Sequence, residues 1–295
     1  SLIFYNMYNY ILHICDYTYI IMELLNNIHF TSDFINKRIG EFKADIAIQL
    51  GTGMTSGFSG LNIHEQIPYI EIPHFQKSTA PSHKGQMIFG TIQGKNIIIL
   101  DGRFHYYEGY TMQEVVFPVY IMKYLGVQNL ILTNASGSVD PELKEGDIVI
   151  ITDHINLHHD NPLRGVNDES IGPRFPGMGN AYDSEVIKNI KHCALKEKIL
   201  IKEGIYLGLS GPNFETPAEY RMARILGANI VGMSTIPEVL AANHCRLKVN
   251  AISLVSNQYD DAHPQEEAEL EGVLNVVKNN SKDLMRLLIS VTQSL

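Results

Sequence analysis

The sequence of 295 residues has few cysteines, no excess of positive charge and no long apolar run that is free of charges. Its three cysteines, Cys15, Cys193 and Cys245, lie far apart, so neither a disulfide framework nor a cysteine zinc site is indicated. The formal net charge of -9 argues against nucleic acid or an anionic membrane as a general partner, because either would need a basic face. A reducing cytoplasm is the simplest compartment for such a chain.

The start of the chain is apolar, but it also carries polar and charged side chains, which are Asn6, Asn9, His13, Asp16 and Glu23. A spanning helix needs about 20 residues with few or no charges, and a signal peptide needs a positive start. We therefore expect no membrane insertion. Residues 1–21 are interpreted as an N-terminal extension, either an amphipathic segment packed on the body or a stretch upstream of a start at Met22. Residues 22–295 then form one domain.

Short β-branched apolar runs alternate with helix-length stretches, and the runs are ADIAIQL, NIIIL, NLILT, DIVIIT, ANIVGM and VNAISLVS. Such runs are typical of strands buried on both faces. The stretches 111–126 and 216–227 have helical spacing and end in glycine, and Thr216 is a plausible N-cap before Pro217. The alternation predicts an α/β domain with a sheet covered on both sides and ligands outside the carboxyl ends of the strands.

The first strand is followed by a glycine-rich turn, GTGMTSG. Gly51 and Gly53 would let backbone amides approach an anion, and Thr52 adds a hydroxyl. A tight turn without a ligand is the ordinary alternative. The turn completes neither G-x-G-x-x-G nor a P-loop, which weakens the dinucleotide and nucleoside-triphosphate interpretations.

Further polar residues near other strand ends extend this set. Arg103 can fork onto a phosphate, and His105 would face the same side if the strand continued. His83 and Ser234 could add further donors, although an exposed loop histidine and a helix cap are their ordinary alternatives. Together these groups would suit one phosphate.

A different set would suit a heterocycle. Phe214 could stack on a ring, Glu215 could accept from a ring N–H, and the Asn257 amide can donate and accept at once. Packing in the core is the alternative for Phe214, and a charge at a helix start is the alternative for Glu215.

The segment DHINLHHD contains the side chains of a possible metal site, His154, His158, His159 and Asp160. The segment follows a strand and reads as a loop, and no H-E-x-x-H pattern is present. We therefore expect no metal site.

Nine blocks occur in the order found in the trimeric purine nucleoside phosphorylases, and these are LGTGM, GRFHYYEGY, TNASGSV, DHINL, NPLRGVND, RFPGM, GPNFETPAE, VGMSTIPEVLAANHC and SLVSN. The chain resembles this family from about residue 23 to residue 257 and, more loosely, to the C-terminal helix. The resemblance implies a single α/β domain with a central mixed β-sheet flanked by helices, of the phosphorylase/hydrolase-like type. It also implies a homotrimer that uses purine nucleoside and phosphate.

The implied reaction is reversible phosphorolysis of 6-oxopurine ribonucleosides or deoxyribonucleosides, such as inosine and guanosine, to the base and the pentose 1-phosphate. Inorganic phosphate is then a co-substrate, and no metal or organic cofactor is needed. The residues that match the family's phosphate contacts are Thr52, His83, Arg103, His105, Ser234 and the backbone of Ala135. Those that match its ribose contacts are Tyr107, Met233 and, from the neighbouring subunit, Phe175. Those that match its purine contacts are Phe214, Glu215 and Asn257, of which the last two, with His105, would be catalytic.

The chain departs from the family pattern at two places. Thr52 replaces a serine but keeps the hydroxyl. The family's HEEV stretch, whose histidine contacts the ribose 5′-hydroxyl, reads LEGV from Leu270 to Val273, and nearby His263 is a candidate substitute.

Two alternatives stay open. A 5′-methylthioadenosine phosphorylase shares the fold and the phosphate site; Asn257 argues against it, whereas the missing histidine keeps it open. A non-catalytic nucleoside-binding protein on the same scaffold is disfavoured because Arg103, His105, Glu215 and Asn257 are all present.

Overall fold

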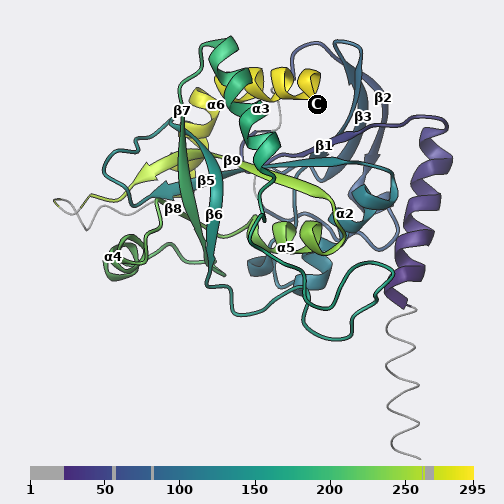
Figure 1. The fold of residues 1–295 in the computed structure, drawn as a ribbon, viewed down its shortest axis with the longest axis horizontal. Helices are drawn as coiled ribbons and strands as arrows, with labels where there is room; N and C mark the ends of the chain where they lie inside the picture. The colour runs from purple at the N-terminus through teal and green to yellow at the C-terminus, as the bar shows by residue number, and fades with distance from the viewer. Residues whose placement is uncertain (1–22, 55–57, 81–82, 261, 263–268) are drawn as a thin grey trace, which may run out of the picture.

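A mixed β-sheet organises the computed structural model, which describes residues 23–54, 58–80, 83–260, 262 and 269–295 (Figure 1). Its strands are β1 (Ile46–Gln49), β2 (Leu61–Pro68), β3 (Gln86–Ile92), β4 (Lys95–Asp101), β5 (Asn129–Ser138), β6 (Ile148–Asn156), β7 (Ile201–Gly208), β8 (Ile230–Gly232) and β9 (Lys248–Gln258). They follow the order β2-β3-β4-β1-β5-β8-β7-β6-β9, and β5 also pairs with β9. The second half of the sheet therefore curls back on itself. The predicted extension 1–21 and His263 lie outside the described residues.

Helices cover both faces of this sheet. They are the helix of residues 23–39, α2 (Met112–Tyr124), α3 (Ser184–Glu197), α4 (Pro217–Ile225), α5 (Ile236–His244) and α6 (Leu270–Ser294). Helices α3 and α6 pack together on one face, and α2 and α5 pack together on the other (Figure 1). A large apolar cluster lies on each face, one built around α2 and α5 and one around α3 and α6. The predicted single α/β domain with a central mixed sheet flanked by helices is confirmed.

Local signals explain where the two predicted helices begin. Thr216 caps α4 by accepting from the backbone N–H of Glu219, while the Glu219 carboxylate accepts from the backbone N–H of Thr216. Pro217 stands in the first turn, where its missing N–H costs nothing. Thr111 and Glu114 form the same reciprocal pair at the start of α2. These pairs satisfy backbone donors that have no partner inside the helix.

The six predicted strands are present, but β2, β3 and β7 were not predicted. Strand β2 is half exposed and carries polar residues, and β7 begins with Ile201, Lys202 and Glu203, so neither reads as a buried run. Strand β6 runs on to Asn156, so the first half of DHINLHHD is strand and the prediction of a loop there was wrong. The pairing of β6 with β7 reaches from Ile148 to Asn156 and holds that half in the sheet.

The condition under which His105 would face the same side as Arg103, a strand that continues past Asp101, is not met. Strand β4 ends at Asp101, and Gly102 turns the chain at a φ of +126°. His105 is the N-cap of the short 3-10 helix η2 (Tyr106–Glu108). The turn directs the side chain of His105 towards the neighbouring strand ends.

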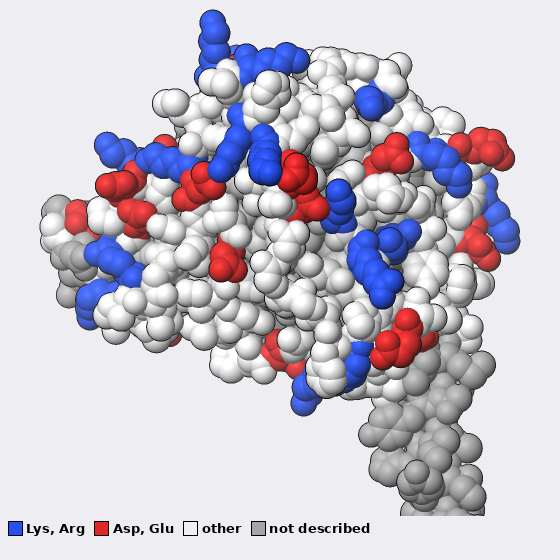
Figure 2. All heavy atoms as spheres, viewed as in Figure 1, with Lys and Arg blue, Asp and Glu red and all other residues white. Residues whose placement is uncertain are grey.

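The surface bears charges of both signs. On the face drawn in Figure 2, basic and acidic side chains are interspersed. Within the part of the chain that the structure describes, no helix has both the length and the apolar character to cross a bilayer. Cys193 and Cys245 are both buried free thiols.

Candidate active site

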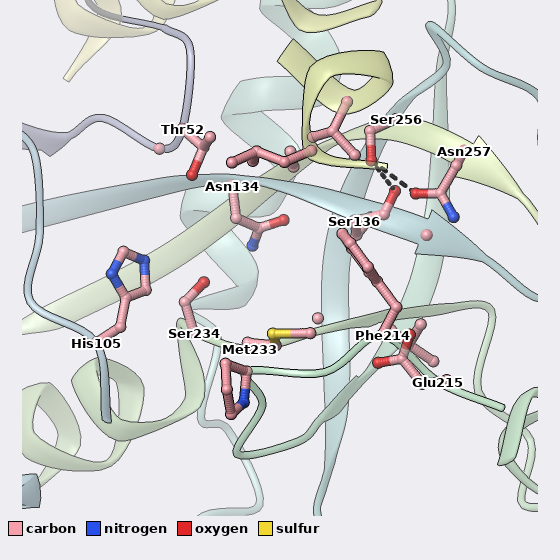
Figure 3. Close-up of a pocket in the computed structure, with 18 of the residues that line it drawn as sticks. Thr52, His105, Asn134, Ser136, Phe214, Glu215, Met233, Ser234, Ser256 and Asn257 are labelled. Atoms are coloured by element: carbon pink, nitrogen blue, oxygen red, sulfur yellow. Dashed lines mark hydrogen bonds between the residues drawn. The ribbon is translucent and has the colours of Figure 1, made fainter. Parts of the chain in front are cut away.

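One cavity of about 260 Å³ opens where several strands end. Strand β1 runs parallel to β4 and β5, and β5 runs parallel to β9, so the carboxyl ends of these four strands meet at one edge. Most of the predicted site residues line the cavity, namely Thr52, Arg103, His105, Tyr107, Ala135, Phe214, Glu215, Met233, Ser234 and Asn257. The two predicted sets lie on opposite sides of it, with Thr52, His105 and Ser234 facing Phe214, Glu215 and Asn257 (Figure 3).

Arg103 is firmly held on the side of the cavity that also contains Thr52, His105 and Ser234. Its side chain is 1% exposed, and its guanidinium donates to Ser234 Oγ at 2.7 Å, to Thr235 Oγ1 at 3.3 Å and to the carbonyl of Thr133 at 2.6 Å. Its Nε lies 3.8 Å from the carboxylate of Glu238, which is also 1% exposed. Ser234 is therefore a partner of the arginine and not a helix cap. Among the described residues that line the cavity, Arg103 supplies the positive charge.

His83 lies behind the cavity wall and connects two of its residues. Its Nδ1 accepts from the backbone N–H of Arg103 at 3.1 Å, which leaves the proton on Nε2, 3.4 Å from Thr52 Oγ1. Burial, together with nearby His105 and Arg103, lowers the pKa of His83 to about 3. His83 is thus a neutral, half-buried group and not an exposed loop histidine.

His105 is held by hydrogen bonds with Glu108, a residue that had not been singled out in the sequence. Glu108 Oε1 lies 2.8 Å from His105 Nδ1 and also accepts from the His105 backbone N–H. Burial raises the pKa of Glu108, but hydrogen bonds from His105 and Thr79 outweigh it and lower the pKa to about 2. The ionised carboxylate keeps the proton on Nδ1, so Nε2 is the nitrogen free to face a ligand. Burial also lowers the pKa of His105, and its ring stacks on Tyr107 at 4.6 Å.

The glycine turn has a role different from the predicted one. The Gly51 amide donates to Thr133 Oγ1 at 3.0 Å, so it is not available to an anion. A Cβ at Gly51 would lie 2.7 Å from the carbonyl oxygen of Thr133 and 2.8 Å from Cα of Asn134. Glycine is needed there because the turn crosses the backbone of β5 closely. Thr52 itself still lines the cavity.

The opposite side is built by the loop before α4 and by the end of β9. Phe214 is 39% exposed and lines the cavity, so it is not a core residue. The cap of α4 is Thr216, which leaves Glu215 free of that task. Burial raises the pKa of Glu215, as expected for a carboxylate in an apolar wall.

The orientation of the Asn257 amide is set by its neighbour Ser256, which had not been predicted. Ser256 Oγ lies 2.9 Å from Asn257 Oδ1 and 3.1 Å from the carbonyl of Ser136, and its single proton is shared between these two acceptors (Figure 3). The amide nitrogen of Asn257 then points away from Ser256 (Figure 3). A Cβ at Gly137 would lie 3.0 Å from that nitrogen, so a larger residue there would press on the amide in this position. A spacing rule on the sequence cannot reveal such a contact.

A buried chain of hydrogen bonds begins at the cavity wall, which Asn134 and Ser136 line. Asn134 Nδ2 donates to Thr235 Oγ1 at 2.8 Å, its Oδ1 accepts from Ser253 at 2.6 Å, and Ser253 contacts Ser136 at 2.6 Å. Thr235 also receives the bond from Arg103. These polar groups are almost fully buried and satisfied, which fixes their geometry.

The other residues singled out in the sequence either lie outside the cavity or make part of its wall apolar. Phe175 is 87% exposed and does not line this cavity. In the stretch LEGV, Leu270 and Val273 do line it, so this part of the wall is apolar. His154 and His159 of the candidate metal segment contact Tyr182 and Ser210 instead. Among the described residues, no group of three or more His, Cys, Asp or Glu is placed to hold a metal ion.

The arrangement offers complementary chemistry at its two sides. One side presents a guanidinium, hydroxyls and a neutral imidazole, which suit an anion with several oxygens. The other presents an aromatic face, a carboxylate acceptor and an oriented amide, which suit a nitrogen heterocycle. The span between them contains Tyr107 and Met233.

Comparison with known proteins supports this interpretation. A family model described as the phosphorylase superfamily matches residues 45–292. Purine nucleoside phosphorylase 1 of Bacillus subtilis is 44% identical over 224 residues, which are 76% of this chain and 82% of that protein. Purine nucleoside phosphorylase of Bos taurus is 43% identical over 251 residues, which are 83% of this chain and 86% of that protein.

Solved structures agree with the sequence relatives. A crystal structure of a Schistosoma purine nucleoside phosphorylase in complex with hypoxanthine superposes with a TM-score of 0.84 at 36% identity, covering 92% of this chain and 97% of that one. The structure of a Schistosoma enzyme in complex with guanosine gives the same values. With a family model over most of its length and relatives above 40% identity, the chain belongs to the purine nucleoside phosphorylases of the phosphorylase superfamily.

Proposed function

We propose that this enzyme cleaves the glycosidic bond of purine nucleosides with inorganic phosphate and releases the free base and the pentose 1-phosphate. The observation that carries the proposal is one cavity with a buried guanidinium and hydroxyls on one side and Glu215 and Asn257 on the other. The complexes of the Schistosoma relatives with hypoxanthine and guanosine support a purine nucleoside as the ligand class.

The proposed chemistry follows from this charge distribution. A phosphate oxygen bonds to the anomeric carbon while the bond to the purine breaks, and the electron pair of that bond moves onto the base. Negative charge next to the sugar stabilises the cation-like transition state. The Asn257 amide donates to the base as it gains charge, and such donors accelerate the step because they bind the transition state more strongly than the ground state. We assign the phosphate to Thr52, Arg103, His105, Ser234 and the Ala135 backbone, with His83 acting through Thr52 and Arg103.

Within the purines, we propose a preference for 6-oxo bases. Inosine and guanosine present an N1–H donor for the Glu215 carboxylate, and acceptors at O6 and N7 for an amide N–H. Adenosine has an unprotonated N1 that would face the carboxylate without a proton between them. An unpaired buried polar group costs roughly 1–3 kcal/mol, so inosine and guanosine should exceed adenosine by at least about tenfold in kcat/KM.

A panel of nucleosides tests both the proposed phosphorolysis and the proposed preference for 6-oxopurines. Purine release is measured from inosine, guanosine, adenosine and 5′-methylthioadenosine, each with and without phosphate. We expect release from the first two only when phosphate or arsenate is present. Equal release in phosphate-free buffer would indicate a hydrolase, and no release with any substrate would indicate a non-catalytic binding protein.

One observation favours a second candidate, a 5′-methylthioadenosine phosphorylase. Leu270 and Val273 line the cavity where the family pattern has a histidine for the ribose 5′-hydroxyl, and an apolar wall suits an alkylthio group. Asn257 and Glu215 together favour the 6-oxopurine assignment. A higher kcat/KM for 5′-methylthioadenosine than for inosine in the same panel would reverse this order.

We further propose a homotrimer in which Phe175 reaches the cavity of a neighbouring subunit. Its ring is 87% exposed, with the guanidinium of Arg174 5.7 Å from its centre, so it is accessible to a neighbouring subunit. Light scattering should give three chains per particle, and Phe175→Ala should raise the KM for inosine. An active monomer would contradict this assignment.

The proposed reaction needs no metal or organic cofactor, so chelation with EDTA should leave the rate unchanged. The cytoplasm remains a prediction from the scarcity of cysteine, to be checked by cell fractionation.

A further inference from the structure

Thr235 lies directly after Ser234, at the start of α5, and its backbone adopts a conformation that is rare for a residue with a side chain. Its φ is +72° and its ψ is -53°. The backbone N–H of Ile236 donates to the carbonyl of Ser234 at 2.8 Å, so Thr235 is the central residue of a γ-turn of the strained type. Such strain persists only where the surrounding contacts hold the turn in place.

The contacts that hold this turn include those of the Thr235 hydroxyl, which is fully buried. Its Oγ1 accepts from Asn134 Nδ2 at 2.8 Å and from Arg103 Nη1 at 3.3 Å. It also lies 3.2 Å from Ser234 Oγ. The Asn134 amide is itself oriented, because its Oδ1 accepts from Ser253 Oγ at 2.6 Å. The hydroxyl of Thr235 therefore connects a buried amide and the guanidinium to the side chain of Ser234.

The number of lone pairs in this cluster decides which hydroxyl donates. A hydroxyl oxygen has two lone pairs and one proton. Asn134 and Arg103 use both lone pairs of Thr235 Oγ1, so Thr235 donates its own proton to Ser234 Oγ. Ser234 Oγ also accepts from Arg103 Nη1 at 2.7 Å, so both of its lone pairs are used as well. Neither Arg103 nor Thr235 can accept the proton of Ser234, and Ser234 lines the cavity, where an anion can accept it (Figure 3).

We propose that Thr235 is a positioning residue whose hydroxyl directs the proton of Ser234 towards the anion in the cavity. This inference rests on the proposed function, since it concerns the phosphate side of the same site. The chain of donors runs from Ser253 through Asn134 and Thr235 to Ser234, and it ends at a phosphate oxygen. In a buried site the members of such a chain polarise one another, so the last hydroxyl binds an anion more strongly than an isolated serine would.

A threonine is suited to this position. Its hydroxyl accepts two hydrogen bonds and donates one, and its β-branched side chain has few rotamers. Thr235→Val keeps the shape of the side chain but removes the hydroxyl. The Ser234 oxygen then regains a lone pair, and its proton is free to turn away from the cavity. Asn134 Nδ2 also loses its acceptor, so the variant should be less stable as well.

The first experiment measures the use of phosphate by variants at this position. Thr235→Val should raise the KM for phosphate about tenfold, the size of one weakened hydrogen bond to a charged group, whereas the KM for inosine should change little. Thr235→Ser, which keeps the hydroxyl, should retain most of the affinity for phosphate. Thr235→Ala, which also lacks the hydroxyl, repeats the measurement if Thr235→Val does not fold.

Thr292→Val is the matched control for the loss of a buried hydroxyl. Thr292 is 1% exposed, donates to the carbonyl of Leu288 at 2.8 Å and does not line the cavity. Its variant should lose stability but keep the KM for phosphate. An equal rise of this KM in Thr292→Val, or an equal rise of both KM values in Thr235→Val, would overturn the inference, because the effect would then be one of stability.

A double-mutant cycle shows whether Thr235 acts through Ser234. Ser234→Ala removes the last donor of the chain, so adding Thr235→Val should weaken phosphate binding no further. The double variant should therefore match Ser234→Ala within about twofold. Losses that multiply in the double variant would show that Thr235 acts on the anion by another route and would overturn the inference.

Binding of inorganic phosphate alone, measured by calorimetry without nucleoside, separates this inference from the proposed function. If the unmodified enzyme cleaves no nucleoside, the proposed function fails. About tenfold weaker phosphate binding by Thr235→Val, with binding retained in Thr235→Ser, would still support the role of Thr235. Equal phosphate affinity in the unmodified protein and in Thr235→Val, or no binding by either, would overturn the inference even if nucleosides are cleaved.

Discussion

The two sides of the cavity are built differently. On the side assigned to phosphate, Arg103 and His105 are 1% and 5% exposed; Arg103 donates to Ser234 and to the carbonyl of Thr133, and His105 is held by Glu108. On the side assigned to the base, Phe214 is 39% exposed, and Glu215 stands in a loop before a helix. The anion side is part of the core, whereas the base side lies at its rim. Substitutions on the phosphate side should therefore lower both stability and activity. Substitutions on the base side should change mainly the selectivity between purine bases.

The pKa shifts on the two sides point in opposite directions. On the anion side, the pKa of His83 falls to about 3 and that of Glu108 to about 2, so acidification favours the unfolded chain. On the base side, burial raises the pKa of Glu215, so the folded chain binds this proton more tightly and acidification favours the folded state. The same contrast between core and rim thus appears in the pH dependence of stability.

The largest expected effect is that of Arg103→Ala. Several charge-assisted contacts are lost at once, each worth about 1.5–3 kcal/mol, so the KM for phosphate should rise about hundredfold or more. The KM for inosine should change much less. Initial rates with each substrate varied at saturation of the other would measure both. An unchanged phosphate dependence would remove Arg103 from the anion site.

Arg103→Ala also leaves Glu238 buried without its cation, which is expected to cost about 3–5 kcal/mol of folding free energy. The double variant Arg103→Ala/Glu238→Gln is the control, since it removes the unpaired charge. It should regain much of the lost Tm without regaining phosphate use. If the double variant recovered both the Tm and the use of phosphate, the arginine would contribute to folding stability and not to phosphate binding.

The next largest effect is expected for Asn257→Asp. A protonated carboxyl can donate to N7 while its other oxygen accepts from a 6-amino group, so the preference for inosine over adenosine should narrow by about tenfold. Ser256→Ala should also narrow it, but less, because the amide would lose its fixed orientation. Ratios of kcat/KM for the two nucleosides measure this. A ratio that stays constant in Asn257→Asp would show that another residue discriminates.

Glu215→Gln should separate activity from stability. The variant keeps an amide oxygen that can accept from N1–H but loses the negative charge that makes this hydrogen bond strong, so kcat/KM for inosine should fall about tenfold. At pH 7 it should be as stable as the unmodified protein or more stable, because it removes a charge whose burial raises its pKa. The stability gap should close as the pH falls, since the unmodified carboxyl then becomes neutral. A large loss of Tm at pH 7 would contradict the assignment of Glu215 to the rim.

At pH 7, the smallest effect is expected for His83→Asn, whose effect appears in the pH dependence of stability. The folded-state pKa of about 3 lies below the ordinary value of 6.5, so the stability contributed by neutral His83 is present above pH 6.5 and lost as the pH falls towards 3. The slope is at most about 1.4 kcal/mol per pH unit, and the variant should lack it. Urea titrations at several pH values would measure both slopes. Parallel slopes would show that His83 is not buried as a neutral group.

The sequence allowed the strand ends and the residues that follow them to be predicted, because buried β-branched runs and polar strand ends are local patterns. Arg103 and Asn257 were found in this way, whereas Phe214 was found as an aromatic ring in the block GPNFETPAE. Glu108 stood beside His105 but was passed over, although its spacing of three residues is that of a cap. Glu238 and Ser256 could not be found, because their contacts depend on side-chain directions and on strands and helices that only the tertiary fold brings together.

The glycines of the site also had roles that the sequence alone did not reveal. Gly51 was expected to expose its amide to an anion, but its amide is engaged by Thr133 and its missing side chain makes room for β5. Gly137 was not predicted at all, although it makes room for the Asn257 amide. A glycine in a sequence indicates that backbone or side chains come close, and only the fold shows which ones.

The most direct test of the central claim, that one cavity joins a phosphate to the sugar of a purine nucleoside, is phosphorus NMR of inosine and phosphate incubated with the enzyme. The proposal predicts a new phosphate-ester resonance, with one equivalent of ester formed for each equivalent of hypoxanthine released. Hypoxanthine that accumulates while the inorganic phosphate signal stays constant would contradict it.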